Sequence, residues 1–244
     1  MKIDYKMNNL LWHHVHITIS DRETAARWYE EHSPAKRTPP TKRSENLYCG
    51  PNLVQIQSKS VAPEPSNGRV ESIGIGVLNL NETVTDWKSA GGFLDNLTSN
   101  TAKVRDPWGV PFELVESSKI GYTHINLTVL EPEKLCSWYE LNLGGSRKQC
   151  EWDDTRLVLE YDTMLIMFIS LSSAIPTTTK RFIDHLGWYT EDLDKTYQRL
   201  SGNDVHFPVL PRKYGPVRLA FAEDSSGNWI EIVEPPNGSI RKSS

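Results

Sequence analysis

The sequence predicts an α+β fold built from four similar units, each made of one strand, one helix and three further strands. Three observations lead to this prediction: one long segment occurs twice, a second segment also occurs twice, and linkers rich in Pro, Ser and Thr lie between units. The units span residues 10–60, 70–118, 120–172 and 182–235.

The first repeat opens units one and three. Residues 14–30, HVHITISDRETAARWYE, align without a gap with residues 124–140, HINLTVLEPEKLCSWYE. Strict alternation in the first part predicts a strand, with His14 and His16 on one polar face. Ser20 and Glu23 form a capping-box pattern, and Pro132 suits a first helical turn, so a helix follows each strand.

The second repeat closes units two and four. Residues 106–116, DPWGVPFELVE, match residues 224–234, DSSGNWIEIVE. Both segments have an Asp-x-x-Gly turn and then a strand that carries a glutamate, Glu113 or Glu231. Upstream of each lies another strand and helix start, at residues 72–87 and 185–200.

Composition excludes several classes of protein. The formal net charge of −4 comes from interspersed acidic and basic residues, so we expect neither nucleic acid nor a membrane as a partner. No run of about 18 apolar residues is present and the amino terminus lacks a signal-peptide pattern, so we expect a cytoplasmic protein. The three cysteines have no C-x-x-C spacing and predict neither a disulfide framework nor a thiolate zinc site.

The repeats place histidine and glutamate at equivalent positions. We expect two domains, residues 1–118 with units one and two and residues 119–244 with units three and four, each forming a half-open barrel. In the second domain His124, His185 and Glu231 would then converge on the concave face. Two imidazoles and one carboxylate leave open positions on a divalent metal, as a catalytic site requires.

These segments resemble the vicinal oxygen chelate superfamily, which includes glyoxalase I, extradiol dioxygenases and the fosfomycin and bleomycin resistance proteins. The motifs are H-V-x-I-x-I-x-D at residues 14–21, T-H-I-N-L-T-V at 123–129, D-H-L-G-W-Y at 184–189, and the two D-x-x-G-x-x-x-E segments. The resemblance implies paired βαβββ modules that hold a metal through first-strand His and last-strand Glu residues. By position, it implies His124, His185 and Glu231 as ligands.

The resemblance also distinguishes between branches of the superfamily. Glyoxalase I has a further Glu ligand on the last strand of the leading module, where this sequence has Gln55 and Met167. The three-ligand branches are therefore favoured. In the first half Ser72 stands where the second His is expected. That half is either a structural or substrate-shielding domain or a second metal site, whose residues would be His14, His16, Gln55 and Glu113.

The general base and the pocket are less well defined by sequence. A general base must reach the proton that it removes, and the nearby candidates are Tyr189, Tyr161 and His206. The predicted pocket wall is largely apolar, which suits an aromatic or hydrophobic ligand and equally describes core packing. Its predicted residues are Asn126, Met167, Phe221 and Trp229.

These observations favour a divalent-metal-dependent enzyme acting on a small molecule with adjacent oxygens. The layout resembles extradiol dioxygenases and favours Fe(II), although Phe221 occupies the position of the tyrosine of that group. One alternative is a glyoxalase-like lyase or isomerase, or a transferase, using Mn(II), Ni(II) or Zn(II). Another is a metal-free binding protein of the bleomycin-resistance type. Both a monomer and a homodimer are compatible with the sequence.

Overall fold

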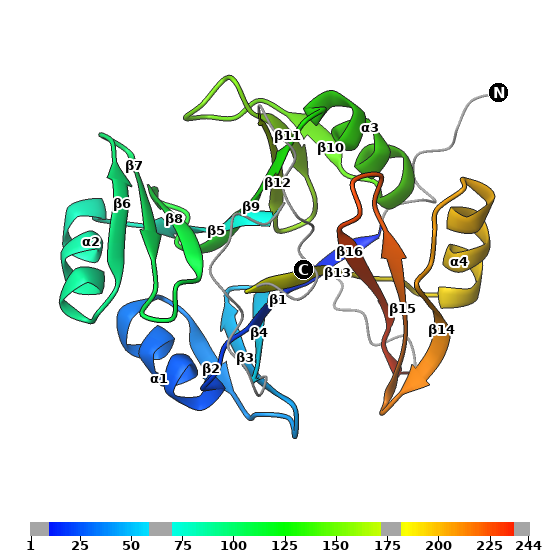
Figure 1. The fold of residues 1–244 in the computed structure, drawn as a ribbon, viewed down its shortest axis with the longest axis horizontal. Helices are drawn as coiled ribbons and strands as arrows, with labels where there is room; N and C mark the ends of the chain where they lie inside the picture. Colours follow the sequence, from blue (N-terminus) through cyan, green and yellow to red (C-terminus); the bar gives the residue numbers. More distant parts are fainter. Residues whose placement is uncertain (1–9, 59–69, 172–181, 237–244) are drawn as a thin grey trace.

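The computed structural model describes residues 10–58, 70–171 and 182–236, and in them it shows two eight-stranded sheets and four helices (Figure 1). The α+β architecture of four βαβββ units is confirmed, because each predicted unit contains one strand, one helix and then three strands. The helices are α1 (Arg22–His32), α2 (Leu80–Ser89), α3 (Pro132–Leu143) and α4 (Leu193–Gly202).

Sheet A is formed by units one and four. Its central strands β1 and β13 run antiparallel, and β4 and β16 flank them in parallel. Its strand order is β14 (Val209–Tyr214), β15 (Val217–Glu223), β16 (Trp229–Glu234), β13 (Ile183–Tyr189), β1 (Leu11–Thr18), β4 (Asn52–Gln57), β3 (Ser44–Cys49) and β2 (Lys36–Thr38).

Sheet B is formed by units two and three with the same topology, since β5 and β9 are antiparallel at its centre. Its strand order is β10 (Ser146–Lys148), β11 (Leu157–Glu160), β12 (Leu165–Ser170), β9 (Gly121–Val129), β5 (Val70–Val77), β8 (Pro111–Glu116), β7 (Thr101–Arg105) and β6 (Phe93–Leu97).

The predicted pairing of units within each half of the chain, residues 1–118 and 119–244, is therefore wrong. Only residues 117–120 connect β8 to β9, so units two and three stay in one sheet. Residues 58–69 and 171–182 join the units within each half, and these longer connections lead from one sheet to the other.

The two units of each half contact each other through their helices instead (Figure 1). Trp28 on α1 donates to the backbone oxygen of Ala90 just after α2, at 2.9 Å. Tyr29 donates to Asp106, in the Asp-x-x-Gly turn of unit two, at 2.5 Å, and Tyr139 donates to Asp224 in unit four at 3.1 Å. These bonds tie sheet A to sheet B, and one continuous hydrophobic core spans both sheets.

The helix starts agree with the sequence in one case and differ in the other. Pro132 is the first residue of α3, as predicted. The N-cap of α1 is Asp21 rather than Ser20, because the Asp21 carboxylate accepts from the backbone N–H of Thr24 at 3.1 Å.

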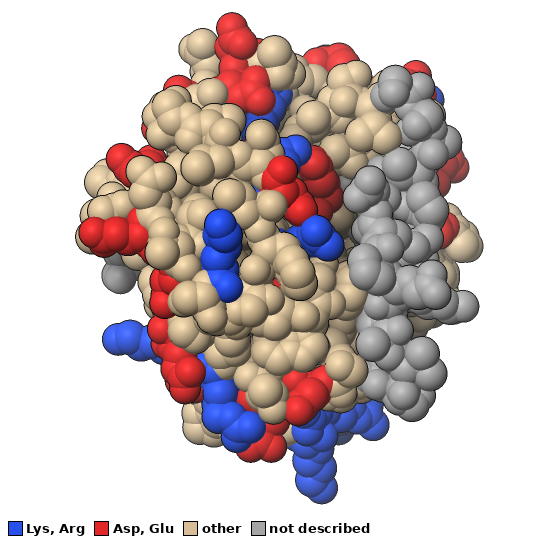
Figure 2. Space-filling view, turned by 60° about the vertical axis from the view of Figure 1, so that its left-hand side comes forward, with Lys and Arg blue, Asp and Glu red and all other residues tan. Residues whose placement is uncertain are grey.

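The surface carries charges of both signs. Figure 2 shows acidic and basic side chains intermixed on one face, without a continuous patch of either sign. Among the described residues, none of the helices has the length and apolar character needed to traverse a bilayer.

Candidate metal centre

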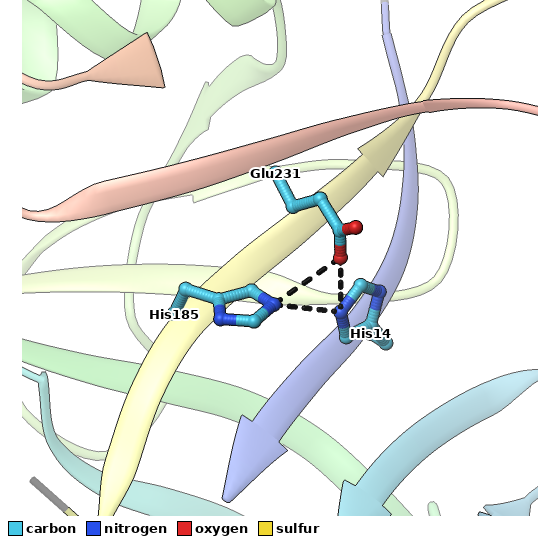
Figure 3. A group of neighbouring side chains, drawn as sticks. All are labelled: His14, His185 and Glu231. Atoms are coloured by element: carbon cyan, nitrogen blue, oxygen red, sulfur yellow. Dashed lines mark hydrogen bonds and ion pairs between the residues drawn. The ribbon is translucent and has the colours of Figure 1, made fainter. Parts of the chain in front are cut away.

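Three side chains on adjacent strands of sheet A meet at one point (Figure 3). His14 lies on β1, His185 on β13 and Glu231 on β16. The Glu231 Oε2 atom is 3.2 Å from the Nε2 atoms of both histidines, and these two nitrogens are 3.3 Å apart. His14 is fully buried, and His185 is 6% exposed.

Strand register and one glycine make this convergence possible. Gly187 on β13 pairs with His14 on one side and with Glu231 on the other. A Cβ atom at Gly187 would lie 2.2 Å from Cε1 of His14. The His14 imidazole therefore lies directly over Gly187, where any larger residue would displace it.

The expected ligand His124 is not at this centre. It lies on β9 in sheet B, whereas His185 and Glu231 lie in sheet A. His14 takes the expected place of His124, because unit one rather than unit three shares a sheet with unit four. The two histidines occupy equivalent positions of the repeat, so the predicted set has the same residue types as this cluster but takes one histidine from unit three instead of unit one.

The charges at the centre depend strongly on one another. Burial opposes ionisation of Glu231, but hydrogen bonds with His14 and His185 hold its pKa well below the ordinary value. Burial would lower the pKa of His185, but the carboxylates of Asp184 and Glu231 outweigh it and raise that pKa to about 9. Burial lowers the pKa of His14.

Two outer contacts orient the histidine rings. The Asp184 Oδ2 atom lies 3.1 Å from Nδ1 of His185, so it accepts the proton of that nitrogen and directs the Nε2 atom toward the centre. The Nδ1 atoms of His13 and His14 are 3.0 Å apart. The His13 ring is stacked on Tyr189 with centroids 3.8 Å apart, so the predicted base Tyr189 supports a neighbour of His14.

His16 and Gln55 lie on β1 and β4 beside His14, His185 and Glu231. The His16 ring stacks on His185 with centroids 4.5 Å apart, and neither of its ring nitrogens has a hydrogen-bond partner among the described residues. Burial and then the charge of His185 lower the pKa of His16 to about 4. Gln55 pairs with His16 across β4 and β1 and donates to Asn46 at 3.3 Å.

The other predicted base candidates lie elsewhere. Tyr161 is buried against Trp188, with ring centroids 5.5 Å apart. Because side chains alternate along β13, Trp188 points to the opposite face of the sheet from His185, and Tyr161 lies on that opposite face too. Tyr161 also lines a cavity of about 300 Å³ whose walls do not include the three converging side chains. The His206 side chain is 70% exposed and contacts Glu223 at 2.9 Å.

The predicted pocket residues divide between the two sheets. Phe221 on β15 packs edge-on against His185, with ring centroids 5.0 Å apart. The rings of Trp229 and Phe221 also pack together, with centroids 5.4 Å apart. These two aromatic residues border the centre in sheet A. Asn126 and Met167 pair with each other in sheet B and are buried there.

Sheet B repeats the arrangement with different chemistry. His124 on β9 and Glu113 on β8 correspond to His14 and Glu231, and Nε2 of His124 lies 2.9 Å from the Glu113 carboxylate. Ser72 stands in place of His185 and accepts from Asn126 at 2.9 Å. Arg156 also binds Glu113 through two nitrogens, at 2.7 and 2.8 Å.

Sequence analysis did not identify Arg156, Asp184 or His13 as site residues. Asp184 and His13 directly precede His185 and His14, so their position beside predicted ligands was an available signal. Arg156 ends the loop of residues 149–156, which is longer than the corresponding loop of unit one, residues 39–43. The repeat therefore has no aligned counterpart that would draw attention to it.

The donor atoms in sheet A fit a divalent metal. Ligands bound to one metal at about 2.1 Å lie roughly 3.0 Å apart in octahedral geometry and roughly 3.4 Å apart in tetrahedral geometry. The three separations of 3.2, 3.2 and 3.3 Å fall within this range. Two imidazoles and one carboxylate on one side of an ion form a facial triad with open positions opposite. A second group, His16, Asp184 and His185, has suitable atoms as well but shares His185 with the first.

Comparisons with known proteins agree with this fold. Glyoxalase I from Zea mays superposes with a TM-score of 0.77 at 17% identity, covering 94% of both chains. A mutant of that enzyme gives a TM-score of 0.80 at 17% identity, again over 94% of both chains. A candidate dioxygenase from Bacillus subtilis gives 0.71 at 13% identity, covering 95% of this chain and 87% of its own. Likeness at such identities shows a shared fold.

Sequence comparison identifies a family for units three and four. No curated protein matches the chain. Residues 121–232 match the Glyoxalase/Bleomycin resistance protein/Dioxygenase superfamily, and they extend from β9 in sheet B to β16 in sheet A. The resemblance indicated by the sequence motifs is confirmed: over residues 121–232 the chain carries a domain of the Glyoxalase/Bleomycin resistance protein/Dioxygenase superfamily.

Proposed function

We propose that this protein is a divalent-metal-dependent enzyme that acts on a small molecule with adjacent oxygen atoms. The observation that carries the proposal is the convergence of His14, His185 and Glu231 within 3.3 Å of one another in sheet A. A structural metal site is closed by four protein ligands, whereas this site offers three. A divalent ion held by these three residues would supply Lewis-acid activation of the substrate oxygens.

The surrounding residues have separate roles in this proposal. Asp184 keeps the proton of His185 on Nδ1, which leaves Nε2 available as a ligand. Phe221 and Trp229 provide an apolar wall on one side of the centre, which favours a substrate with an aromatic or hydrophobic part.

His16 is the general base that we propose. It is 3% exposed and lies against His185, and neither of its ring nitrogens has a hydrogen-bond partner among the described residues, so a nitrogen lone pair is available to take a proton from a substrate beside the centre. Its Nδ1 atom is 3.6 Å from Asp184, too far for a hydrogen bond. A His16→Gln variant should retain the metal and lose turnover, whereas a change in a ligand should lose both.

The donor set favours a dioxygenase that uses Fe(II). Two histidines and one carboxylate with open positions are typical of non-haem Fe(II) oxygenases. Gln55 lies on the neighbouring strand β4, where it offers a neutral amide rather than a second carboxylate. The proposed site therefore has a single anionic ligand.

A glyoxalase-like lyase or isomerase, or a transferase, using Mn(II), Ni(II) or Zn(II) is the second candidate. The observation that favours it is Phe221, whose ring contacts His185 and has no hydroxyl group for acid-base chemistry. The third alternative, a metal-free binding protein, does not account for the convergence of two histidines and a glutamate.

Metal analysis by inductively coupled plasma mass spectrometry tests the proposal. The protein should be purified anaerobically without a metal-affinity tag, beside the variants His14→Ala and His124→Ala. These variants remove the same side chain from equivalent positions of the two sheets. We expect about one equivalent of metal in the native protein and in His124→Ala, and none in His14→Ala.

The metal found then selects the reaction class. Iron would direct oxygen-consumption assays with catechol-like compounds, whereas manganese, nickel or zinc would direct lyase, isomerase and transferase assays. If the native protein holds no metal after purification and takes up none on reconstitution, the enzyme proposal fails and small-molecule binding becomes the function to test.

A further inference from the structure

Sheet B contains a second copy of the metal centre in which an arginine occupies the cation position. Gly74 pairs with His124 and with Glu113, just as Gly187 pairs with His14 and Glu231 in sheet A. A Cβ atom at Gly74 would lie 2.0 Å from the His124 ring. The backbone of sheet B thus makes the same space for an imidazole beside a glutamate.

The guanidinium of Arg156 fills the remaining space. Its NH1 atom lies 2.7 Å from Glu113 Oε2, the same oxygen that lies 2.9 Å from Nε2 of His124. Its NH2 atom binds the other carboxylate oxygen at 2.8 Å, and NH1 also lies 3.1 Å from the side-chain oxygen of Asn126. The side chains of Arg156 and Glu113 are 9% and 1% exposed.

The loop of residues 149–156 holds this arginine in place. Asp153 binds Nε of Arg156 at 2.7 Å, and Trp152 packs on the His124 ring with centroids 5.4 Å apart. Each of the three guanidinium nitrogens therefore donates to at least one acceptor from the protein. An arginine keeps its charge at any pH at which the protein is folded, so this cation is permanent.

Strand register identifies the residue that replaces Arg156 in sheet A. Val158 pairs with Met167 on β12, and Asn46 pairs with Gln55 at the equivalent place on β4. Arg156 lies two residues before Val158, and Ser44 lies two residues before Asn46. Ser44 is therefore the counterpart of Arg156 in sheet A. The short Ser44 side chain binds Thr41 and Asn46 instead of reaching the metal ligands.

We propose that Arg156 is a built-in cation that occupies a second, latent divalent-metal site formed by His124, Glu113 and Asn126. The native protein therefore binds no divalent ion in sheet B, and removing the guanidinium opens a site there. The Arg156 guanidinium binds both oxygens of Glu113 and repels a second cation. The guanidinium and a divalent ion therefore exclude each other from this site. This inference concerns sheet B and goes beyond the function proposed for sheet A.

Zinc binding to purified protein tests it. Native protein, Arg156→Ala and Arg156→Ala/His124→Ala are stripped with a chelator, dialysed against Zn²⁺ and analysed for bound metal. We expect Arg156→Ala to bind one equivalent more than native protein, and the added His124 change to remove that increment. Arg147→Ala is the matched control, because Arg147 forms surface ion pairs with Glu133 and Glu140, and it should give no increment.

Two further variants sharpen the result. Arg156→Lys keeps the positive charge and should not gain an ion. Adding Ser72→His to Arg156→Ala supplies a ligand at the position equivalent to His185, and should bind the additional ion more tightly. If Arg156→Ala does not fold, Arg156→Gln, which is similar in length and neutral, replaces it in the same comparison.

The outcome is independent of the centre in sheet A. If sheet A binds no metal, the proposal still requires an increment of one ion that depends on His124, now counted from zero. A folded Arg156→Ala protein without that increment overturns the proposal. So does a native protein whose bound ion is lost on His124→Ala, because sheet B would then hold metal with Arg156 in place.

Discussion

Gly187 provides a test of the metal centre that changes no ligand. The His14 ring lies over this glycine, and a Cβ atom there would be 2.2 Å from Cε1 and 2.3 Å from Nδ1 of His14. In Gly187→Ala the ring must therefore withdraw by about 1 Å to reach an ordinary van der Waals distance of at least 3.4 Å. Backbone strain does not contribute, because Gly187 lies within the regular strand β13.

A displacement of this size is large for a metal ligand. Ligand distances in functional sites hold to about ±0.2 Å, so a shift of about 1 Å removes His14 from coordination. Loss of an outer supporting residue alone typically costs about 10- to 100-fold in metal affinity. We expect Gly187→Ala to lose at least that much, or about 1.4 to 2.7 kcal/mol of binding free energy.

Gly74→Ala is the matched control, because its Cβ atom meets His124 in sheet B in the same way. Each substitution overpacks a buried site, so we expect both to lower the free energy of unfolding by about 1 to 3 kcal/mol. Isothermal titration calorimetry with Zn²⁺ and urea denaturation of the metal-free proteins measure the two effects. Equal metal affinity in both variants would refute the reasoning, and a loss in Gly74→Ala alone would place the metal in sheet B.

Three other predictions follow from the contacts of these sites. Glu113→Gln leaves the buried guanidinium of Arg156 without its carboxylate. The free energy of unfolding, measured by urea denaturation, should therefore fall by about 3 to 5 kcal/mol, while the metal content stays unchanged. A fall of less than about 1 kcal/mol would contradict this. Asp184→Asn removes the acceptor of the Nδ1 proton of His185, so the Kd for Zn²⁺ measured by calorimetry should rise about 10- to 100-fold. An unchanged Kd would show that Asp184 does not orient His185 for metal binding. In metal-free protein the pKa of His185 is about 9, against 6.5 in the unfolded chain, so its stabilising proton is fully bound below pH 6.5 and lost as pH rises through 9. Urea denaturation should therefore show stability falling by roughly 2 kcal/mol from pH 6.5 to 8, at about 1.4 kcal/mol per pH unit, and an equal slope in His185→Gln would show that another group is responsible.

Repetition in the sequence was sufficient to predict the four units but not how they pair. Every unit contributes the same set of strands, so a sheet of units three and four satisfies the repeat as well as a sheet of units one and four does. The difference lies in the connections: residues 117–120 are too few to leave the sheet, whereas residues 58–69 and 171–182 lead from one sheet to the other.

The same ambiguity explains which site residues were predicted. Glu231 and His185 were placed together because they lie in one unit, while the third residue of the proposed site depended on the pairing of units and was therefore predicted to be His124 instead of His14. Arg156 was beyond prediction, since its role depends on a loop conformation and on a carboxylate, Glu113, that lies 43 positions earlier in the chain. No periodicity in the sequence relates the two.

The arrangement of units also sets an order for folding during synthesis. Sheet B uses one continuous stretch, residues 70–170, and all of its strands exist before unit four is made. Sheet A instead joins β1, near the start of the chain, to β13 and β16 near its end. Until these strands emerge, β1 has an unpaired edge, which is the kind of edge that pairs with other chains. His14, His185 and Glu231 come together only when the last strand is in place, so the proposed metal site is complete only once the fold is complete.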